Sequence, residues 1–294
     1  MIYQSKVAPK YDFFEEKNIQ FLISLLDRNN ENVTGLGASI ITHSCQTHDE
    51  QKILADAGVL KKLINLLGGT TNQRDASLES FATIIKENPE VISKFVGPEN
   101  GRTWDTFIEL TKDRYPRTRL LACTCLNLIK NAAPSYLQSV GMRTKLILVL
   151  LELLDDHGQV GDEALFTLSS FIADDEAWEN QPLPYSPSPP SVTYLRSALN
   201  FITDALTHTN EDVRVAACIC LKNISRSVKY LSAGRFMIES VIMPLIQLLF
   251  DPSTSVQVAA LCTISNIVVD FTMHKSLFVQ NGGVKKGSLW SSEH

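Results

Sequence analysis

The sequence predicts an all-α fold, an α-solenoid in which similar helical units stack along the chain. The first observation is a degenerate repeat, because segment 212–225 returns at 255–268, with earlier copies at 117–130 and 162–171. Each copy centres on a small residue, here called the anchor, with a large apolar residue four positions later. The anchors are Gly37, Ser77, Ala122, Ala164, Ala217 and Ala260. The second observation is their spacing of 40, 45, 42, 53 and 43 residues, since a period in the low forties with helical patterning is typical of α-solenoids.

Each repeat is predicted to contain three helical pieces, of which the anchored helix is the third. The second piece has apolar residues at i, i+3, i+4 and i+7, which marks a core-facing stripe. These stretches are 19–26, 59–67, 104–110, 146–154, 199–206 and 242–249. The first piece is short and ends at Gly58, Gly141 or Gly282, where glycine fits a left-handed helix cap. Short polar turns join the second and third pieces, so these two helices are expected to pack as an antiparallel pair.

Composition excludes several classes of protein. The net charge is -5 over 294 residues, which argues against a non-specific nucleic-acid binder, because such proteins carry a clear cationic surplus. The longest apolar stretch, 146–154, is far shorter than the roughly 20 residues that cross a bilayer. The N-terminus lacks the apolar core of a signal peptide. We therefore expect a soluble intracellular protein that binds neither nucleic acid nor membrane.

The cysteines and histidines indicate no metal site. Two Cys-x-Cys pairs occur, at 123–125 and 218–220, but residues two apart on a helix point in nearly opposite directions and cannot grip one ion. The alternative, which we prefer, is that the thiols are reduced and pack as small apolar residues. No nucleotide-binding loop, hydrolase elbow or metalloprotease motif is present. We expect no cofactor, no metal and no catalytic residue.

The short first helix and longer second and third helices are typical of armadillo repeats, and several strings resemble one family more closely. They are 11–18, 31–44, 74–80, 94–102, 225–229 and 251–260. Over about 1–175 and 199–285 the chain resembles the armadillo repeat-containing protein 8 family, in a shortened plant form. The resemblance implies a right-handed superhelix of about six armadillo-like repeats. It also implies a non-enzymatic scaffold of the CTLH/GID ubiquitin ligase, in cytoplasm and nucleus, linking a substrate receptor to the LisH/CTLH-RING core.

Two segments depart from that pattern. Five prolines lie within 181–190, so we predict repeats over 1–175, a Pro-rich linker or disordered insertion over 176–197, and repeats again over 198–286, the last one truncated. The alternative for the proline run is a docking site for a proline-recognising domain. The segment 287–294 is predicted to be a disordered tail. Because neither end carries a polar cap, we expect a shortened form with adhesive apolar ends.

Third helices of armadillo solenoids line a concave groove, and two kinds of residue there are candidates for partner binding. Six positions after the anchor, the family often has asparagine, and this chain has Asn223 and Asn266. Basic residues gather near two third helices, and Arg119, Arg226 and Lys229 are the candidates for holding an acidic partner segment. The alternative is that these cations are solvated or pack through their stems.

A second function stays open, a peptide-binding adaptor in transport or signalling of the importin or catenin kind. Two positions after the anchor, import proteins carry tryptophan, whereas this chain has Ser39, Glu79, Thr124, Phe166, Ile219 and Cys262. The sequence therefore speaks against recognition of nuclear-localisation signals in the importin manner. An enzyme with an unfamiliar site is a third, remote alternative, since no convergent polar cluster is evident.

Overall fold

The computed structural model describes residues 10–95, 101–132, 140–154, 156, 158–173, 199–228, 238–270 and 279. Helices and no strands occur in these ranges. The helices are α1 (Glu16–Leu26), α2 (Glu31–Ser44), α3 (His48–Asp56), α4 (Val59–Leu66), α5 (Thr71–Ile85), α6 (Pro89–Phe95), α7 (Gly101–Leu110), α8 (Pro116–Ala132), α9 (Val140–Leu153), α10 (Gln159–Ala173), α12 (Glu211–Val228), α13 (Ile238–Leu248) and α14 (Thr254–Asp270). Residues 199–205 are also helical.

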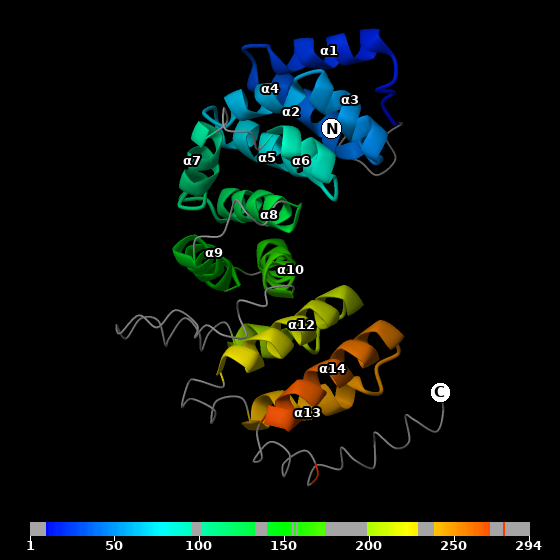
Figure 1. Cartoon of the computed structure of the whole chain (residues 1–294), viewed down its shortest axis with the longest axis vertical. Coiled ribbons are helices and arrows are strands. Elements are labelled where there is room, and N and C mark those ends of the chain that lie inside the picture. The colour runs from blue at the N-terminus through cyan, green and yellow to red at the C-terminus, as the bar shows by residue number, and fades with distance from the viewer. Residues whose placement is uncertain are drawn as a thin grey trace. The chain divides into compact units, whose positions relative to one another are not determined.

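The chain divides into two compact units, Met1–Leu146 and Ile147–His294. In the first unit the third helices α2, α5 and α8 pack in succession, and the second helices α1, α4 and α7 each pack on the third helix of their own repeat (Figure 1). In the second unit α10, α12 and α14 pack in the same succession, with α13 against α14. This order confirms the predicted all-helical solenoid of three-helix repeats.

The helix boundaries follow local sequence signals. Thr47 and Glu50 form a reciprocal capping box at the start of α3, which satisfies backbone N–H groups that the helix itself leaves unpaired. Gly58 connects α3 to α4 with φ of 79°, a left-handed conformation that costs glycine little. The predicted glycine turn between the first and second pieces is therefore confirmed at this repeat. The predicted cap at Gly141 is wrong, because this glycine lies inside α9, which begins at Val140 and continues through it. Residues 136–139 and Gly282 lie outside the described part of the chain.

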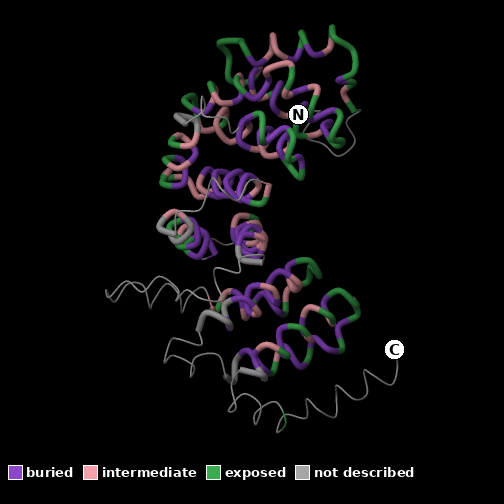
Figure 2. The backbone as a smooth tube through the Cα atoms, viewed as in Figure 1, coloured by how far each residue is buried: buried purple, intermediate pink, exposed green. Residues whose placement is uncertain are grey.

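The anchors lie in the buried parts of the third helices. All six are buried, and burial follows the facing sides of neighbouring helices within each unit (Figure 2). A Cβ atom added at Gly37 would lie 3.0 Å from Leu26 Cδ2, so α2 approaches α1 closely at this point. A small anchor lets the second and third helices of one repeat come together, which explains why the sequence repeats it.

A hydrogen bond recurs between successive third helices. The side chain three positions after the anchor donates to the backbone carbonyl one position after the preceding anchor. The four examples are Ser80 to Ala38 (2.7 Å), Cys125 to Leu78 (3.4 Å), Cys220 to Leu165 (3.9 Å) and Thr263 to Cys218 (2.9 Å). Small side chains with a donor fit this buried position, so the repeated cysteines and hydroxyl residues there share one structural task.

Several predictions concern segments that the structure does not describe. The Pro-rich linker over 176–197, the tail over 287–294 and the first nine residues lie outside the described ranges. The predicted domain boundaries therefore stay predictions.

Among the helices that the structure describes, none combines the length and the apolar character that a membrane span requires.

Candidate functional site

A hollow of about 850 Å³ opens on the third helices of the first unit. We call it the first-unit groove. It is lined by α2 and α5, with one side chain from α8. Lining residues occupy matching positions in the repeats, since Ser39 and Glu79 both lie two after their anchors, and Gly35 and Asp75 both lie two before them. The same face of each third helix therefore builds the surface, as the sequence predicted for a solenoid groove.

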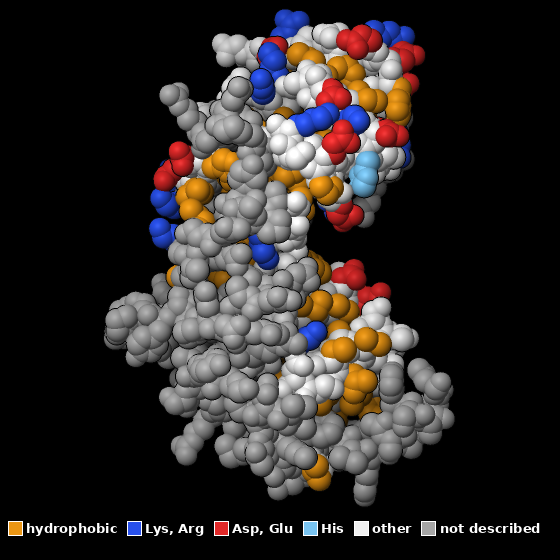
Figure 3. Space-filling model, in the orientation of Figure 1, with side chains coloured by type: hydrophobic (Ala, Val, Ile, Leu, Met, Phe, Trp, Pro, Cys, Tyr) orange, Lys and Arg blue, Asp and Glu red, His pale blue; other side chains and the backbone are white. Residues whose placement is uncertain are grey.

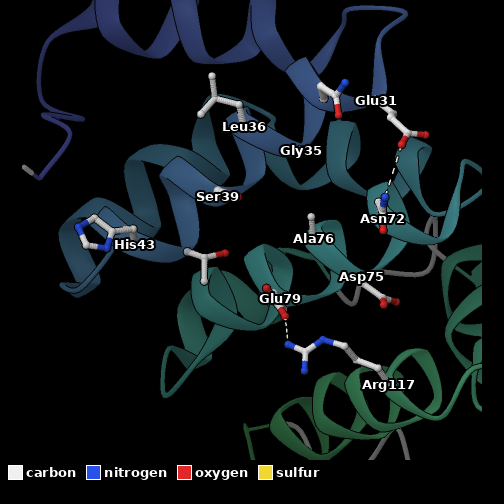
Figure 4. A pocket seen from close by; sticks show the side chains of 12 residues that line it. Glu31, Gly35, Leu36, Ser39, His43, Asn72, Asp75, Ala76, Glu79 and Arg117 are labelled. Carbon is white, nitrogen blue, oxygen red and sulfur yellow. Dashed lines mark hydrogen bonds and ion pairs between the residues drawn. The ribbon is translucent and has the colours of Figure 1, made fainter. Parts of the chain in front are cut away.

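Three carboxylates among the described residues line the groove (Figure 4). Each has a different partner. Glu79 of α5 forms an ion pair with Arg117 of α8. Asp75, one helical turn before Glu79, accepts a hydrogen bond from Thr118 Oγ1 at 2.6 Å. Glu31, in the first turn of α2, accepts a hydrogen bond from Asn72 Nδ2 at 3.4 Å. Among the described residues, Glu31 and Asp75 make no ion pair.

The groove also has an apolar and hydroxyl portion. Leu36 is 39 % exposed and projects from α2, with Ser39 and His43 further along the same helix (Figure 4). Ala76 of α5 lies opposite. Thr42 Oγ1 and Ser80 Oγ lie 3.0 Å apart, which joins α2 to α5 beneath this part of the surface. The groove thus combines charge with a small apolar floor.

The two predicted asparagines belong to the second unit, and neither is among the residues that line the first-unit groove. The Nδ2 atom of Asn223 donates to the Ile219 carbonyl of its own helix at 3.0 Å, and the side chain is buried. The Nδ2 atom of Asn266 is buried and has no hydrogen-bond partner among the described residues. No contact described here tests whether either amide reads a peptide, so this role stays a prediction.

The predicted cationic surface is only partly described. Arg119 is half-buried and donates to the Asp113 carbonyl at 3.2 Å. Arg117 pairs with Glu79, and Lys112 pairs with Glu109. The side chain of Arg226 and the whole of Lys229 lie outside the described part of the chain. Near α8 the structure therefore favours the alternative in which cations serve pairing and packing, and the role of Arg226 and Lys229 stays a prediction.

The third helices of the second unit present a different chemistry. Val215 and Ile219 of α12 are half-buried, while Val258 and Cys262 of α14 are exposed. These are the positions two before and two after the anchors, where the first unit has Asp75, Ser39 and Glu79. At these positions α12 and α14 are apolar, whereas α2 and α5 have glycine, serine or acidic residues. Leu120 of α8 and Asp162 of α10 do not follow this contrast. Figure 3 shows acidic and basic side chains gathered on the first unit and hydrophobic ones on the described part of the second.

The acidic groove was missed by the sequence reasoning, although a signal was available. Ser39 and Glu79 lie two positions after their anchors, and they were used only to show that the tryptophans of import proteins are absent there. Reading the position two before the anchor as well would have found Asp75 on the same face. The partner of Glu79, Arg117, comes from the next repeat, so a single helical pattern does not reveal this pair.

The described residues contain no group of three or more His, Cys, Asp or Glu that could hold a metal ion. Burial raises the pKa of the Cys123 and Cys218 thiols to about 12, so both remain protonated at neutral pH. The arrangement is suited to holding an elongated partner, since its polar groups are spread along helices rather than converging on one point.

Comparison with family models supports the repeat assignment. The model of the Armadillo/beta-catenin-like repeat matches residues 235–269, and the model of the HEAT repeat matches residues 198–228. Solved structures agree. The chain is similar to a designed armadillo repeat protein, with a TM-score of 0.59 and 19 % identity over 85 % of this chain and 99 % of that one. Another designed armadillo repeat protein, in complex with the peptide (KR)4, has a TM-score of 0.55 and 18 % identity over 85 % of this chain and 99 % of that one. These likenesses show the fold alone.

Two curated proteins share sequence with the chain. GID complex subunit 5 of Schizosaccharomyces pombe is 32 % identical over 110 residues, which is 33 % of this chain and 14 % of that protein. Armadillo repeat-containing protein 8 of Xenopus laevis is 32 % identical over 84 residues, 29 % of this chain and 12 % of that protein. The chain thus matches only a small part of the length of each relative.

Proposed function

We propose that this chain, an armadillo repeat protein with distant similarity to armadillo repeat-containing protein 8 and GID complex subunit 5, is a non-enzymatic scaffold subunit of a GID-type ubiquitin ligase. Its task would be to link a substrate receptor to the catalytic core of the LisH/CTLH-RING subunits. The observation that carries the proposal is the 32 % identity to a protein named as a subunit of the GID complex. The proposed location is cytoplasm and nucleus.

The physical basis of the proposal is a solenoid's extended surface. Successive third helices pack at fixed spacing within each unit, so they offer partners a continuous and rigid platform. A scaffold that holds two modules at a suitable separation raises their effective concentration without contributing any chemistry. The polar groove on α2 and α5 and the apolar face of α12 and α14 support this role, because the two surfaces would select different partners.

Affinity purification of the tagged chain, followed by mass spectrometry, tests the proposal. We expect substrate-receptor and RING-containing subunits to co-purify with the chain. Val258→Asp places a charge on the exposed apolar face of α14 and should weaken this association. Met243→Asp is the matched control, because Met243 is 38 % exposed but lies on the second helix α13. A folded chain that retains none of these ligase subunits would contradict the proposal.

The adaptor alternative has one supporting observation, the groove itself. Its import version gains no support from the lining, because Ser39 and Glu79 occupy the positions where import proteins carry tryptophan, and both line the groove. Tryptophan pockets hold lysine stems by stacking and cation–π contact, which serine and glutamate cannot provide. A pull-down in which the transport machinery is recovered and ligase subunits are not would favour this alternative.

A further inference from the structure

We infer that the first-unit groove holds an extended segment of a partner protein that carries at least two lysine or arginine residues. The inference rests on the proposed scaffold function, because it takes the third-helix face to be a protein-binding surface. It adds the chemical class of the segment that binds there.

Charge is the first argument. Glu31, Asp75 and Glu79 line the groove, and Arg117 is the cation among its lining residues. Among the described lining residues, the formal charges of these carboxylates and of Arg117 leave two negative charges in surplus. Complementary charge steers a basic segment toward the groove and rejects an acidic one, because juxtaposing like charges costs free energy.

The arrangement of the carboxylates is the second argument. Asp75 and Glu79 lie one turn apart on α5, so they project from the same face of the helix. Glu31 lies on the neighbouring helix α2, where Asn72 of α5 donates a hydrogen bond to it (Figure 4). Acceptors spread over two helices suit cationic side chains that alternate along an extended chain, since alternate side chains of such a chain share one face. A single compact cation could not reach all of them.

The apolar floor is the third argument. Leu36 is 39 % exposed, and Ala76 lines the hollow from α5. Lysine and arginine bury their methylene stems on apolar surface while the charged ends reach a carboxylate. The hollow of about 850 Å³ lies within the usual range of ligand sites, roughly 300–1,000 Å³. The floor and the volume therefore favour long basic side chains over small polar ones.

Glu79 and Arg117 add a point at which binding can be tuned. Their ion pair joins α5 to α8, and the two side chains are 32 % and 38 % exposed. Arg117 neutralises the carboxylate nearest to α8, so its presence weakens the field that a basic segment meets. Removing the guanidinium should make the groove more acidic and strengthen binding.

Fluorescence anisotropy with the purified full chain tests the inference. The probe is a labelled ten-residue peptide of alternating lysine and serine, compared with a glutamate–serine peptide of equal length. We expect the lysine peptide to bind, and its affinity to fall between about 50 mM and about 300 mM salt as screening increases. Glu31→Gln combined with Asp75→Asn should weaken binding roughly tenfold at low salt, on the scale of two partly exposed ion pairs. Arg117→Gln should strengthen it.

The matched control is Asp105→Asn combined with Glu109→Gln, which removes two charges from exposed positions of α7 without touching the groove. This variant should bind as the unaltered chain does. Equal binding of the glutamate peptide, an unaffected groove variant, or equal weakening by the control would each overturn the inference. Sedimentation showing that a second copy of the chain occupies the groove, with the groove variant monomeric, would overturn it as well.

A second measurement needs no substitution. In the unaltered chain, the lysine peptide should slow hydrogen exchange in α2 and α5, and protection confined to other helices would overturn the inference. The purification experiment is independent of these assays. Loss of peptide binding with ligase subunits still recovered contradicts only the inference about the groove. Peptide binding without ligase subunits contradicts only the proposed scaffold function.

Discussion

Arg214 and Asp251 form a two-pronged ion pair that joins successive repeats of the second unit. Arg214 Nε lies 2.8 Å from Asp251 Oδ2, and Arg214 Nη2 lies 2.8 Å from Asp251 Oδ1. Their side chains are only 11 % and 7 % exposed. Arg214 Nη1 also donates to the His208 carbonyl at 2.7 Å. One guanidinium therefore fastens the turn of its own repeat to the turn of the next.

The same relationship occurs in the first unit. Arg74 forms an ion pair with Asp113. Arg74, like Arg214, lies three positions before its anchor. Asp113, like Asp251, lies nine positions before the next anchor. Arg119 is also three before its anchor and donates to the Asp113 carbonyl, as Arg214 donates to His208. Arg119, which the sequence suggested for partner binding, is thus one of these structural arginines. This explains why a basic cluster can mark a repeat junction rather than a binding surface.

Replacing the arginine of this junction should destabilise the second unit. Arg214→Met leaves the buried Asp251 carboxylate without its cation, and removing one partner of a buried pair costs about 3 kcal/mol. Lys62→Met is the control, because the Lys62–Asp27 pair is 37 % and 48 % exposed and such pairs contribute less than about 1 kcal/mol. Urea unfolding followed by circular dichroism measures both. If both variants lost the same free energy of unfolding, the structural role of Arg214 would be contradicted.

The junction should also make stability depend on acid pH. Burial acts to raise the pKa of Asp251, but hydrogen bonds from Arg214 and the Ser253 amide, with the Arg214 charge, outweigh it and hold the pKa below its ordinary value. The folded state therefore favours the carboxylate more than the unfolded state does. Its stabilising contribution is complete at neutral pH and disappears as the pH falls below about 4. We expect the unfolding temperature of Asp251→Asn to fall less than that of the unaltered chain between neutral pH and a pH of about 3. An equal fall in both proteins would contradict this explanation.

The recurring hydrogen bond between third helices gives a third prediction. Thr263 is fully buried, and its hydroxyl lies 2.9 Å from the Cys218 carbonyl of the preceding repeat and 2.8 Å from the Ala259 carbonyl of its own helix. Thr263→Val keeps the shape and removes the donor, so it should lower the free energy of unfolding by about 1 kcal/mol. Thr203→Val is the control, because the Thr203 hydroxyl bonds the Leu199 carbonyl of its own helix. Chemical denaturation of both variants would test the bond, and a larger loss in the control would show that it has no special role.

Thiol reactivity should separate one cysteine from the other five. Cys262 is exposed, whereas Cys45, Cys123, Cys125, Cys218 and Cys220 are buried. Burial raises the pKa of the Cys45, Cys123 and Cys218 thiols to about 12, and the thiolate is the reactive form. A thiol-specific chromophore should therefore modify one group quickly in the folded chain. Cys262→Ser should abolish that fast reaction. If the fast reaction persisted in this variant, one of the five buried thiols would have to become accessible to the reagent.

The anchors provide a prediction about packing. Ala217 is fully buried on α12, which packs against both α10 and α14. Ala217→Leu should destabilise the chain by about 1–3 kcal/mol through overpacking. Ala259→Leu is the control, because Ala259 neighbours an anchor but is only half-buried. Comparing the unfolding midpoints of the two variants measures the difference, and a control as unstable as the anchor variant would contradict the packing role.

The sequence by itself determined the repeat, its period, the anchors and the helix type of each piece. Those properties are local or periodic, since a small residue at Ala217 or Ala260 and an apolar residue four later define one face of one helix. It also placed Ser39 and Glu79 on the groove side. Only the tertiary structure decided that Glu31, Asp75 and Glu79 share a hollow with Arg117, and that Arg214 faces Asp251. These groups lie about one repeat apart, so their meeting depends on how neighbouring helices are offset and on rotamers chosen by packing, which a single helical pattern does not encode.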